Sequence, residues 1–181
     1  LSHSSAASDV YKRQEKNLLL PYQKNKIIKL LANCSGHTGI AGGQELDLKF
    51  ENKKKTLKQI IEMQTNKTGK LFNFCLQASA LIAKKNNKEQ LTFGKLGEEI
   101  GLLFQLADDF LDLKGSKKLA GKPTKKDKKK GKSTLINLMG YEKASNYTDK
   151  LKKKILLNLK KRGKNAKGLT ETVEFILNRN F

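Results

Sequence analysis

The sequence predicts an all-α fold, and three observations support this prediction. Apolar residues recur at steps of three and four over most of the 181 residues, which is the spacing of one helix face. The alternating pattern of β-branched and aromatic residues that indicates strands is almost absent. Pro123 and the glycines at 115, 121 and 131 fall in one polar segment, and we therefore expect a loop over 114–133.

The same periodicity predicts five helices. Their expected bounds, in chain order, are 23–36, 56–86, 89–113, 134–161 and 169–179. The second expected helix is supported by positions three or four apart, namely Leu57, Ile60, Ile61, Thr65, Thr68, Leu71 and Phe72. The fourth is supported by an apolar stripe between solvent-facing lysines, namely Leu151, Ile155, Leu156 and Leu159.

The third expected helix carries the tightest cluster of carboxylates in the chain, within GLLFQLADDFLD at 101–112. At about 100° per residue, one face of this helix carries Gln105, Asp108, Asp109 and Asp112. Crowded carboxylates repel one another unless a cation lies between them, and Mg²⁺ prefers oxygen ligands. Taken alone, the cluster is equally compatible with a solvated acidic face.

Basic and polar segments on both sides of this cluster favour the cation. Downstream, GKPTKKDKKKGKST at 121–134 holds Lys122 and Lys132, each preceded by a glycine. Upstream, GGQELDL at 42–48 and NKTGKL at 66–71 add a glutamine, a carboxylate and a Lys-Thr pair on expected helices. The set suggests a diphosphate held through Mg²⁺. If the Lys-Thr pair stood alone, the favoured interpretation of its lysine would be a surface residue whose aliphatic stem packs on the helix.

In their order and approximate spacing, these motifs resemble those of the trans-isoprenyl diphosphate synthases, or polyprenyl synthetases, closest to short-chain farnesyl and geranylgeranyl diphosphate synthases. GGQELDL resembles the family's GGQ-x-x-D-L helix, KTG at 67–69 its Lys-Thr-Gly, and FQLADDFLD at 104–112 its second aspartate-rich motif. GKPTKKDKKKGKST resembles its GKxxGxDxxxGKxT segment, with Lys125 where many members have glycine. The resemblance covers roughly 25–180 and implies the C-terminal part of the isoprenoid synthase helical bundle.

The resemblance implies a prenyltransferase that condenses an allylic diphosphate with isopentenyl diphosphate, uses Mg²⁺ as its cofactor and forms a homodimer at full length. The implied metal residues are Asp108, Asp109 and Asp112, with Asp109 assisting through water or neighbouring groups. Asp47 and Asp127 are expected to orient lysines or water rather than bind the metal.

The resemblance also implies which residues act on the substrate. The implied substrate-binding residues are Lys67, Thr68, Gln105, Lys122 and Lys132. Lys67, Thr68 and Gln105 are also the implied catalytic residues, because Thr68 and Gln105 would lie at the reacting end of the allylic diphosphate.

One family motif has no counterpart in this sequence. Family members carry a first aspartate-rich motif upstream of the second, and no such motif precedes residue 108. We therefore expect 15–181 to be the C-terminal portion of a polyprenyl synthetase domain that is inactive alone. Residues 1–14 (LSHSSAASDVYKRQ) match nothing in the family and resemble an adaptor-derived translation artefact, so we expect a non-native scar. The alternative is a noncatalytic homologous subunit or diphosphate-binding module.

The formal charge of +21 raises a third hypothesis, a basic nucleic-acid binder. Three of the 38 basic residues are arginines, whereas base recognition favours arginine and single-strand binding favours aromatic platforms. We therefore expect no specific nucleic-acid partner. GKST at 131–134 is not the end of a P-loop, because the required glycine at 126 is Lys126.

Two further patterns bear on the compartment. No run of about 18 apolar residues predicts a membrane span, and the chain is expected to be soluble and cytoplasmic. Cys34 and Cys75 lack the spacing of a zinc site or a disulfide framework, so we expect both to be buried apolar residues.

Overall fold

The computed structural model describes residues 19–51, 53–119 and 134–178, and these residues are helical apart from short connections. No strand occurs within these ranges, so the all-α prediction is confirmed. In chain order the elements are α2 (Pro21–Ser35), α3 (Ile40–Phe50), α4 (Leu57–Gln64), the π-helix η1 (Thr65–Gly69), α5 (Lys70–Ile82), α6 (Asn87–Leu119), α7 (Leu135–Met139), α8 (Tyr141–Lys160), the 3₁₀ helix η2 (Gly163–Ala166) and α9 (Lys167–Asn178).

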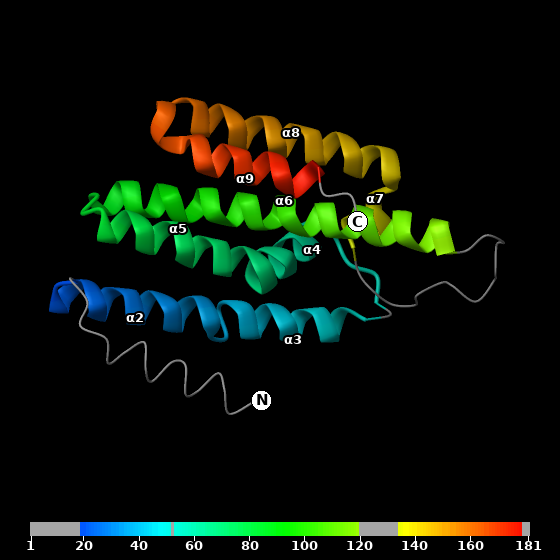
Figure 1. Ribbon diagram of the computed structural model, residues 1–181. Coiled ribbons are helices and arrows are strands. Elements are labelled where there is room, and N and C mark those ends of the chain that lie inside the picture. The colour runs from blue at the N-terminus through cyan, green and yellow to red at the C-terminus, as the bar shows by residue number, and fades with distance from the viewer. Residues whose placement is uncertain (1–18, 52, 120–133, 179–181) are drawn as a thin grey trace.

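Figure 1 shows these helices in three layers. α2 and α3 follow one another along one edge, α4, α5 and α6 form the middle, and α8 and α9 lie on the other side. α6 contacts α4, η1 and α5 as well as α7, α8 and α9. It is therefore the helix around which the other elements pack.

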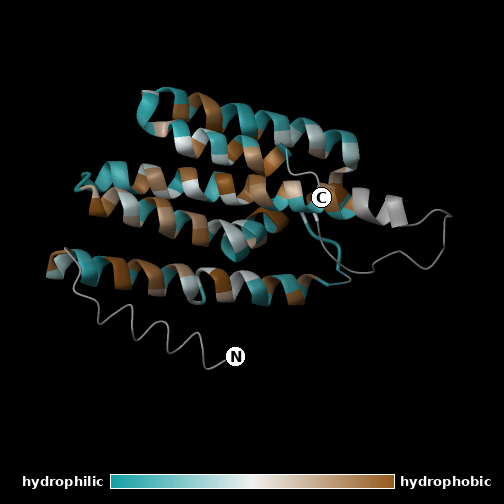
Figure 2. Ribbon diagram, viewed as in Figure 1, coloured by the Kyte–Doolittle hydropathy of each residue, from teal (hydrophilic) through white to brown (hydrophobic). Residues whose placement is uncertain are grey.

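The core runs along α6. Leu96, Ile100, Leu103 and Leu106 are almost fully buried and recur at steps of three and four. They belong to one hydrophobic cluster with residues of the neighbouring helices. Burial of each such side chain contributes about 1.5–3 kcal/mol to folding. Figure 2 shows hydrophobic stretches along α5 and α6.

α8 covers the side of α6 away from α2 and α3. Its buried residues lie mostly three or four positions apart, namely Ala144, Thr148, Leu151, Ile155 and Leu159. This confirms the apolar stripe predicted for the fourth helix, with Leu156 half-buried beside it. Lys154 Nζ lies 2.6 Å from Glu99 Oε1 and joins α8 to α6 at the edge of the core.

Two expected helices are interrupted in the structure. The expected helix over 56–86 is divided into α4 and α5 by the π-helix η1. The expected helix over 134–161 is divided at Gly140, which has a φ of 83° and separates α7 from α8. A positive φ is accessible to glycine without the steric cost that other residues carry, so Gly140 can end one helix and begin the next.

Two other expectations were wrong in part. α6 continues through Gly115 to Leu119, so the first part of the expected loop over 114–133 is helical. One glycine costs a helix only about 1 kcal/mol, and a helix anchored along its length tolerates that cost. The list of five expected helices also omits α3, although GGQELDL at 42–48 is expected to be helical, and the structure confirms a helix there. The remaining loop residues, 120–133, and the expected scar at 1–14 lie outside the described residues.

The cysteine prediction holds for Cys34 and is wrong for Cys75. Both thiols are free, but Cys34 is buried and Cys75 is exposed on α5. Among the described residues, no helix has the length and apolar character needed to cross a membrane.

Candidate functional site

Lys67 and Thr68 lie in the π-helix η1, between α4 and α5. A π turn inserts an extra residue into an α-helix and changes the direction of the side chains that follow. α4 begins regularly, with Thr56 and Gln59 forming a capping box, so the irregularity is confined to the Lys-Thr motif. Such π turns in α-helices are frequent at functional sites.

The backbone of η1 packs closely against α3 at Gly43. A Cβ atom on Gly43 would lie 2.2 Å from the Lys67 backbone nitrogen, which is closer than real Cβ contacts. Glycine at this position therefore lets α3 approach η1. The approach brings Asp47 of α3 to Lys67, with 2.6 Å between Asp47 Oδ2 and Lys67 Nζ.

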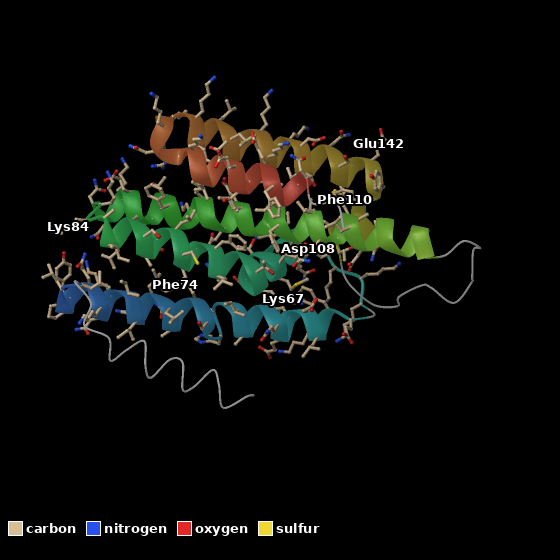
Figure 3. The ribbon with its side chains drawn as sticks, in the orientation of Figure 1. Lys67, Phe74, Lys84, Asp108, Phe110 and Glu142 are labelled. Carbon is tan, nitrogen blue, oxygen red and sulfur yellow. The ribbon has the colours of Figure 1, made fainter. Side chains whose placement is uncertain are left out.

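This ion pair confirms the prediction that Asp47 orients a lysine. The Lys67 side chain is 39% exposed and that of Asp47 is 33% exposed, so the ammonium group is held in place and remains open to solvent. Figure 3 shows Lys67 between η1 and α3, and Asp108 on α6 at the same end of the bundle.

A chain of side-chain hydrogen bonds links η1 to α6. The Thr68 hydroxyl donates to Gln105 Oε1 at 3.2 Å, and Gln105 Nε2 donates to Asp109 Oδ1 at 3.1 Å. Gln64 Nε2, from the end of α4, donates to Asp109 Oδ2 at 3.3 Å. The two ends of the Gln105 amide are thus fixed, with its oxygen directed toward Thr68.

Asp109 is the buried member of the acidic cluster, with 9% of its surface exposed. The pKa of its carboxyl group is raised from an ordinary 3.8 to about 6. Burial is the largest cause, the hydrogen bonds from Gln105 and Gln64 oppose the rise, and the charges of Asp112 and Asp108 add to it. Each Asp109 oxygen already accepts a hydrogen bond from an amide. In this arrangement Asp109 is better suited to positioning Gln105 than to binding a metal directly.

Asp108 and Asp112 are one helical turn apart on α6, with Asp108 half-buried and Asp112 exposed. Within the described residues, no three His, Cys, Asp or Glu side chains are grouped closely enough to hold a metal ion by themselves. Mg²⁺ commonly binds through one or two carboxylates together with water and substrate phosphates. Asp108 and Asp112 suit that kind of site better than an all-protein cage.

A second polar cluster lies beside the site, between α5 and α6. Lys70 Nζ and Asn73 Nδ2 lie 2.6 and 2.9 Å from Glu98 Oε1. Both contacts satisfy the Glu98 carboxylate, so Lys70 forms a structural ion pair and is not directed toward a ligand. Among the lysines of the KTGK segment, Lys67 is thus the one directed to the site.

Gln64 is the site residue that sequence reasoning missed. It is 4% exposed, and its Oε1 atom has no hydrogen-bond partner among the described residues. A spacing signal was present, because Gln64 precedes Thr68 by four positions and both could share one helix face. Its partner on α6 could be found only in three dimensions.

The structure thus brings Lys67, Thr68, Gln105 and the acidic segment of α6 to one end of the bundle. The other expected substrate-binding residues, Lys122 and Lys132, lie outside the described residues, as does Asp127.

Comparison with known proteins gives consistent matches. The model of the Polyprenyl synthetase family matches residues 4–176. The farnesyl diphosphate synthase of Bacillus subtilis is 34% identical over 124 residues, which are 68% of this chain and 42% of that protein. The geranylgeranyl diphosphate synthase of Cyanophora paradoxa is 30% identical over 156 residues, which are 86% of this chain and 52% of that protein.

Solved structures agree with these sequence matches. A geranyltransferase from Helicobacter pylori, complexed with magnesium and isoprenyl diphosphate, superposes with a TM-score of 0.71 at 31% identity, covering 89% of this chain and 53% of that one. An FPP/GFPP synthase from Zymomonas mobilis gives a TM-score of 0.73 at 31% identity, covering 87% and 52%. The chain therefore spans about half the length of the relatives it matches, or slightly less.

Proposed function

Since the chain belongs to the polyprenyl synthetase family, we propose that it contributes the allylic diphosphate site of a farnesyl diphosphate synthase-like prenyltransferase. The observation that carries this proposal is the hydrogen-bonded chain Thr68–Gln105–Asp109, which lies beside the Lys67–Asp47 ion pair. The exposed Asp112 follows Asp109 by about one turn of α6. A fixed ammonium group, a hydroxyl group and an amide oxygen adjoin carboxylates there. This is a set of groups suited to a diphosphate and to the positive charge that develops when it leaves.

In the proposed reaction, the C–O bond of an allylic diphosphate breaks and its electron pair leaves with the diphosphate. The double bond of isopentenyl diphosphate attacks the allylic carbon, and loss of a proton restores a double bond in a chain five carbons longer. The Lys67 ammonium would neutralise diphosphate charge, while Asp47 keeps it in place. The Gln105 amide is held because Oε1 accepts from Thr68 and Nε2 donates to Asp109, and its Oε1 would face the developing allylic cation.

Asp108 and Asp112 would hold Mg²⁺ together with diphosphate oxygens, and that ion would stabilise the charge on the leaving group. Asp109 would keep Gln105 oriented rather than bind the ion, because both of its oxygens are engaged by amides. The proposal has three further parts. The full-length protein is a homodimer, and Lys122 and Lys132 bind the diphosphate. Turnover requires a first aspartate-rich motif from elsewhere.

A noncatalytic subunit or diphosphate-binding module is the second candidate. It is compatible with the same geometry, because the Lys67–Asp47 pair and the exposed Asp112 could hold a diphosphate without turnover. Both candidates bind a diphosphate, and they differ in whether these residues can support turnover.

A chimera distinguishes the two candidates. The first half of the Bacillus subtilis relative would be joined ahead of residue 19 and assayed for incorporation of labelled isopentenyl diphosphate. We expect Mg²⁺-dependent elongation, and a loss of about a hundredfold or more when Asp108 and Asp112 are both changed to Asn. A folded chimera that binds the allylic diphosphate without elongating it would support the binding module instead.

A further inference from the structure

The side of α8 that faces away from the core carries exposed leucine among lysines. Leu157 is 52% exposed and lies about 200° around the helix from the fully buried Ile155. The residues around it line a shallow groove of about 270 Å³, namely Asp149, Lys152, Lys153, Leu156, Leu157 and Lys160. We name these six residues the α8 outer face.

The charge of this helix is strongly unbalanced. α8 contains six lysines and two acidic residues, Glu142 and Asp149. Lys154 is paired with Glu99, whereas no ion pair joins the three lysines of the α8 outer face to a carboxylate of the described residues. Figure 1 places α8 at the edge of the bundle, and Figure 3 shows nitrogen-tipped side chains extending outward from that side. Within the described residues, the positive charge of this face is therefore not neutralised by ion pairs.

We propose that the α8 outer face docks on the surface of an anionic phospholipid bilayer, with the helix lying in the plane of the interface. Lysine stems can lie along apolar surface while their ammonium groups reach the lipid phosphates. Leu157, the exposed leucine of the face, would enter the boundary between headgroups and acyl chains. Anionic lipids attract clustered lysines near the surface, so charge and apolar contact act together.

The observations favour a lipid surface over a nucleic acid. The α8 outer face contains three lysines, two leucines and one carboxylate, Asp149, and neither an arginine nor an aromatic residue. The nearby Arg162 is turned inward, with its guanidinium carbon 4.1 Å from the centre of the Phe93 ring. A phosphate backbone would leave the exposed Leu157 without an apolar partner, whereas a bilayer provides one.

The test is co-sedimentation of the full chain with vesicles of phosphatidylcholine, with and without phosphatidylglycerol. We expect partitioning that requires phosphatidylglycerol and weakens with salt. The triple variant Lys152→Gln, Lys153→Gln, Lys160→Gln should weaken partitioning by about a hundredfold. Leu157→Asn, which leaves every charge in place, should weaken it by about tenfold, with the salt dependence retained.

The matched control removes the same charge from another surface. Lys24, Lys26 and Lys29 are exposed on α2, at the opposite edge of the bundle, and their change to Gln should leave partitioning close to that of the unaltered chain. Equal losses in the two triple variants would overturn the proposal, because net charge alone would then explain binding. Failure to bind anionic vesicles would also overturn it. So would a chain that binds duplex DNA but no vesicles, if the α8 triple variant abolishes the DNA binding. Circular dichroism and melting curves verify that each variant is folded.

Discussion

Asp109 affects both the geometry of the candidate site and the stability of the fold. Its folded-state pKa of about 6 lies above its ordinary value of 3.8, so the folded protein holds this proton more tightly than the unfolded chain. The stability contributed by protonated Asp109 is therefore fully present below its ordinary pKa and is lost as the pH rises to about 6. At neutral pH the site keeps a buried charge, at a cost in stability, to hold Gln105.

Removing that charge should stabilise the fold. At about pH 7, we expect Asp109→Asn to raise the free energy of unfolding by about 2 kcal/mol, and at about pH 4 to change it little. Gln64 can accommodate the new amide, because its Oε1 is buried without a partner among the described residues and can accept a hydrogen bond. Urea denaturation of both proteins at the two pH values measures the difference. A difference that is the same at both pH values would count against the raised pKa.

Gln64 should affect the stability of the fold through its hydrogen bond to Asp109. Gln64→Leu removes a donor to a buried carboxylate, and we expect it to lower the free energy of unfolding by about 1–3 kcal/mol at neutral pH. It should also raise the pKa of Asp109, which NMR titration of the side chain can follow. In the Asp109→Asn background the same change should cost much less, and equal costs in the two backgrounds would show that the two residues are not coupled.

At the scale of elements, the site depends on how closely α3 packs against the π-helix η1. Gly43 permits this approach, and Asp47, one turn further along α3, pairs with Lys67 because of it. The sequence predicts the amphipathic stripes of the helices, because burial follows their periodicity. It does not predict η1 or the break at Gly140, because the apolar steps of three and four on either side of each are also those of one continuous helix.

A methyl group at Gly43 should separate the two elements. We expect Gly43→Ala to lower the free energy of unfolding by about 2 kcal/mol, because the Lys67 backbone cannot move as a flexible side chain could. Gly168→Ala is the matched control in α9, where a Cβ would meet nothing within 4 Å, and it should stabilise the helix by up to about 1 kcal/mol. Thermal denaturation compares the two, and equal effects would contradict the close packing.

The whole molecule exposes apolar surface beyond its core. Ile28 and Leu31 on α2 are 60% and 41% exposed, and Leu71 and Ile82 on α5 are 49% and 47% exposed. Apolar surface of this kind favours association. We expect the chain to self-associate with increasing concentration in sedimentation equilibrium, and Ile28→Lys to weaken the association. A single mass at all concentrations would contradict this expectation.

Much of the site could be anticipated from motif order. The Lys-Thr pair, Gln105 and the acidic segment meet as expected, and Asp47 orients Lys67. The burial of Asp109 could not be anticipated, because periodicity places it on the same face as Asp108 and Asp112. Its environment is set by the end of α4, which covers it and provides Gln64, and that contact joins residues 45 positions apart.

The most direct test of the central claim is calorimetric titration of the chain with inorganic pyrophosphate, with and without Mg²⁺. We predict binding that requires Mg²⁺ and that is weakened about tenfold or more by Asp108→Asn, by Asp112→Asn and by Lys67→Gln. Asp149→Asn, an exposed carboxylate on α8, is the control and should leave the affinity unchanged. Pyrophosphate binding that is indifferent to Mg²⁺ and to all three site variants would contradict a diphosphate site on this face of α6.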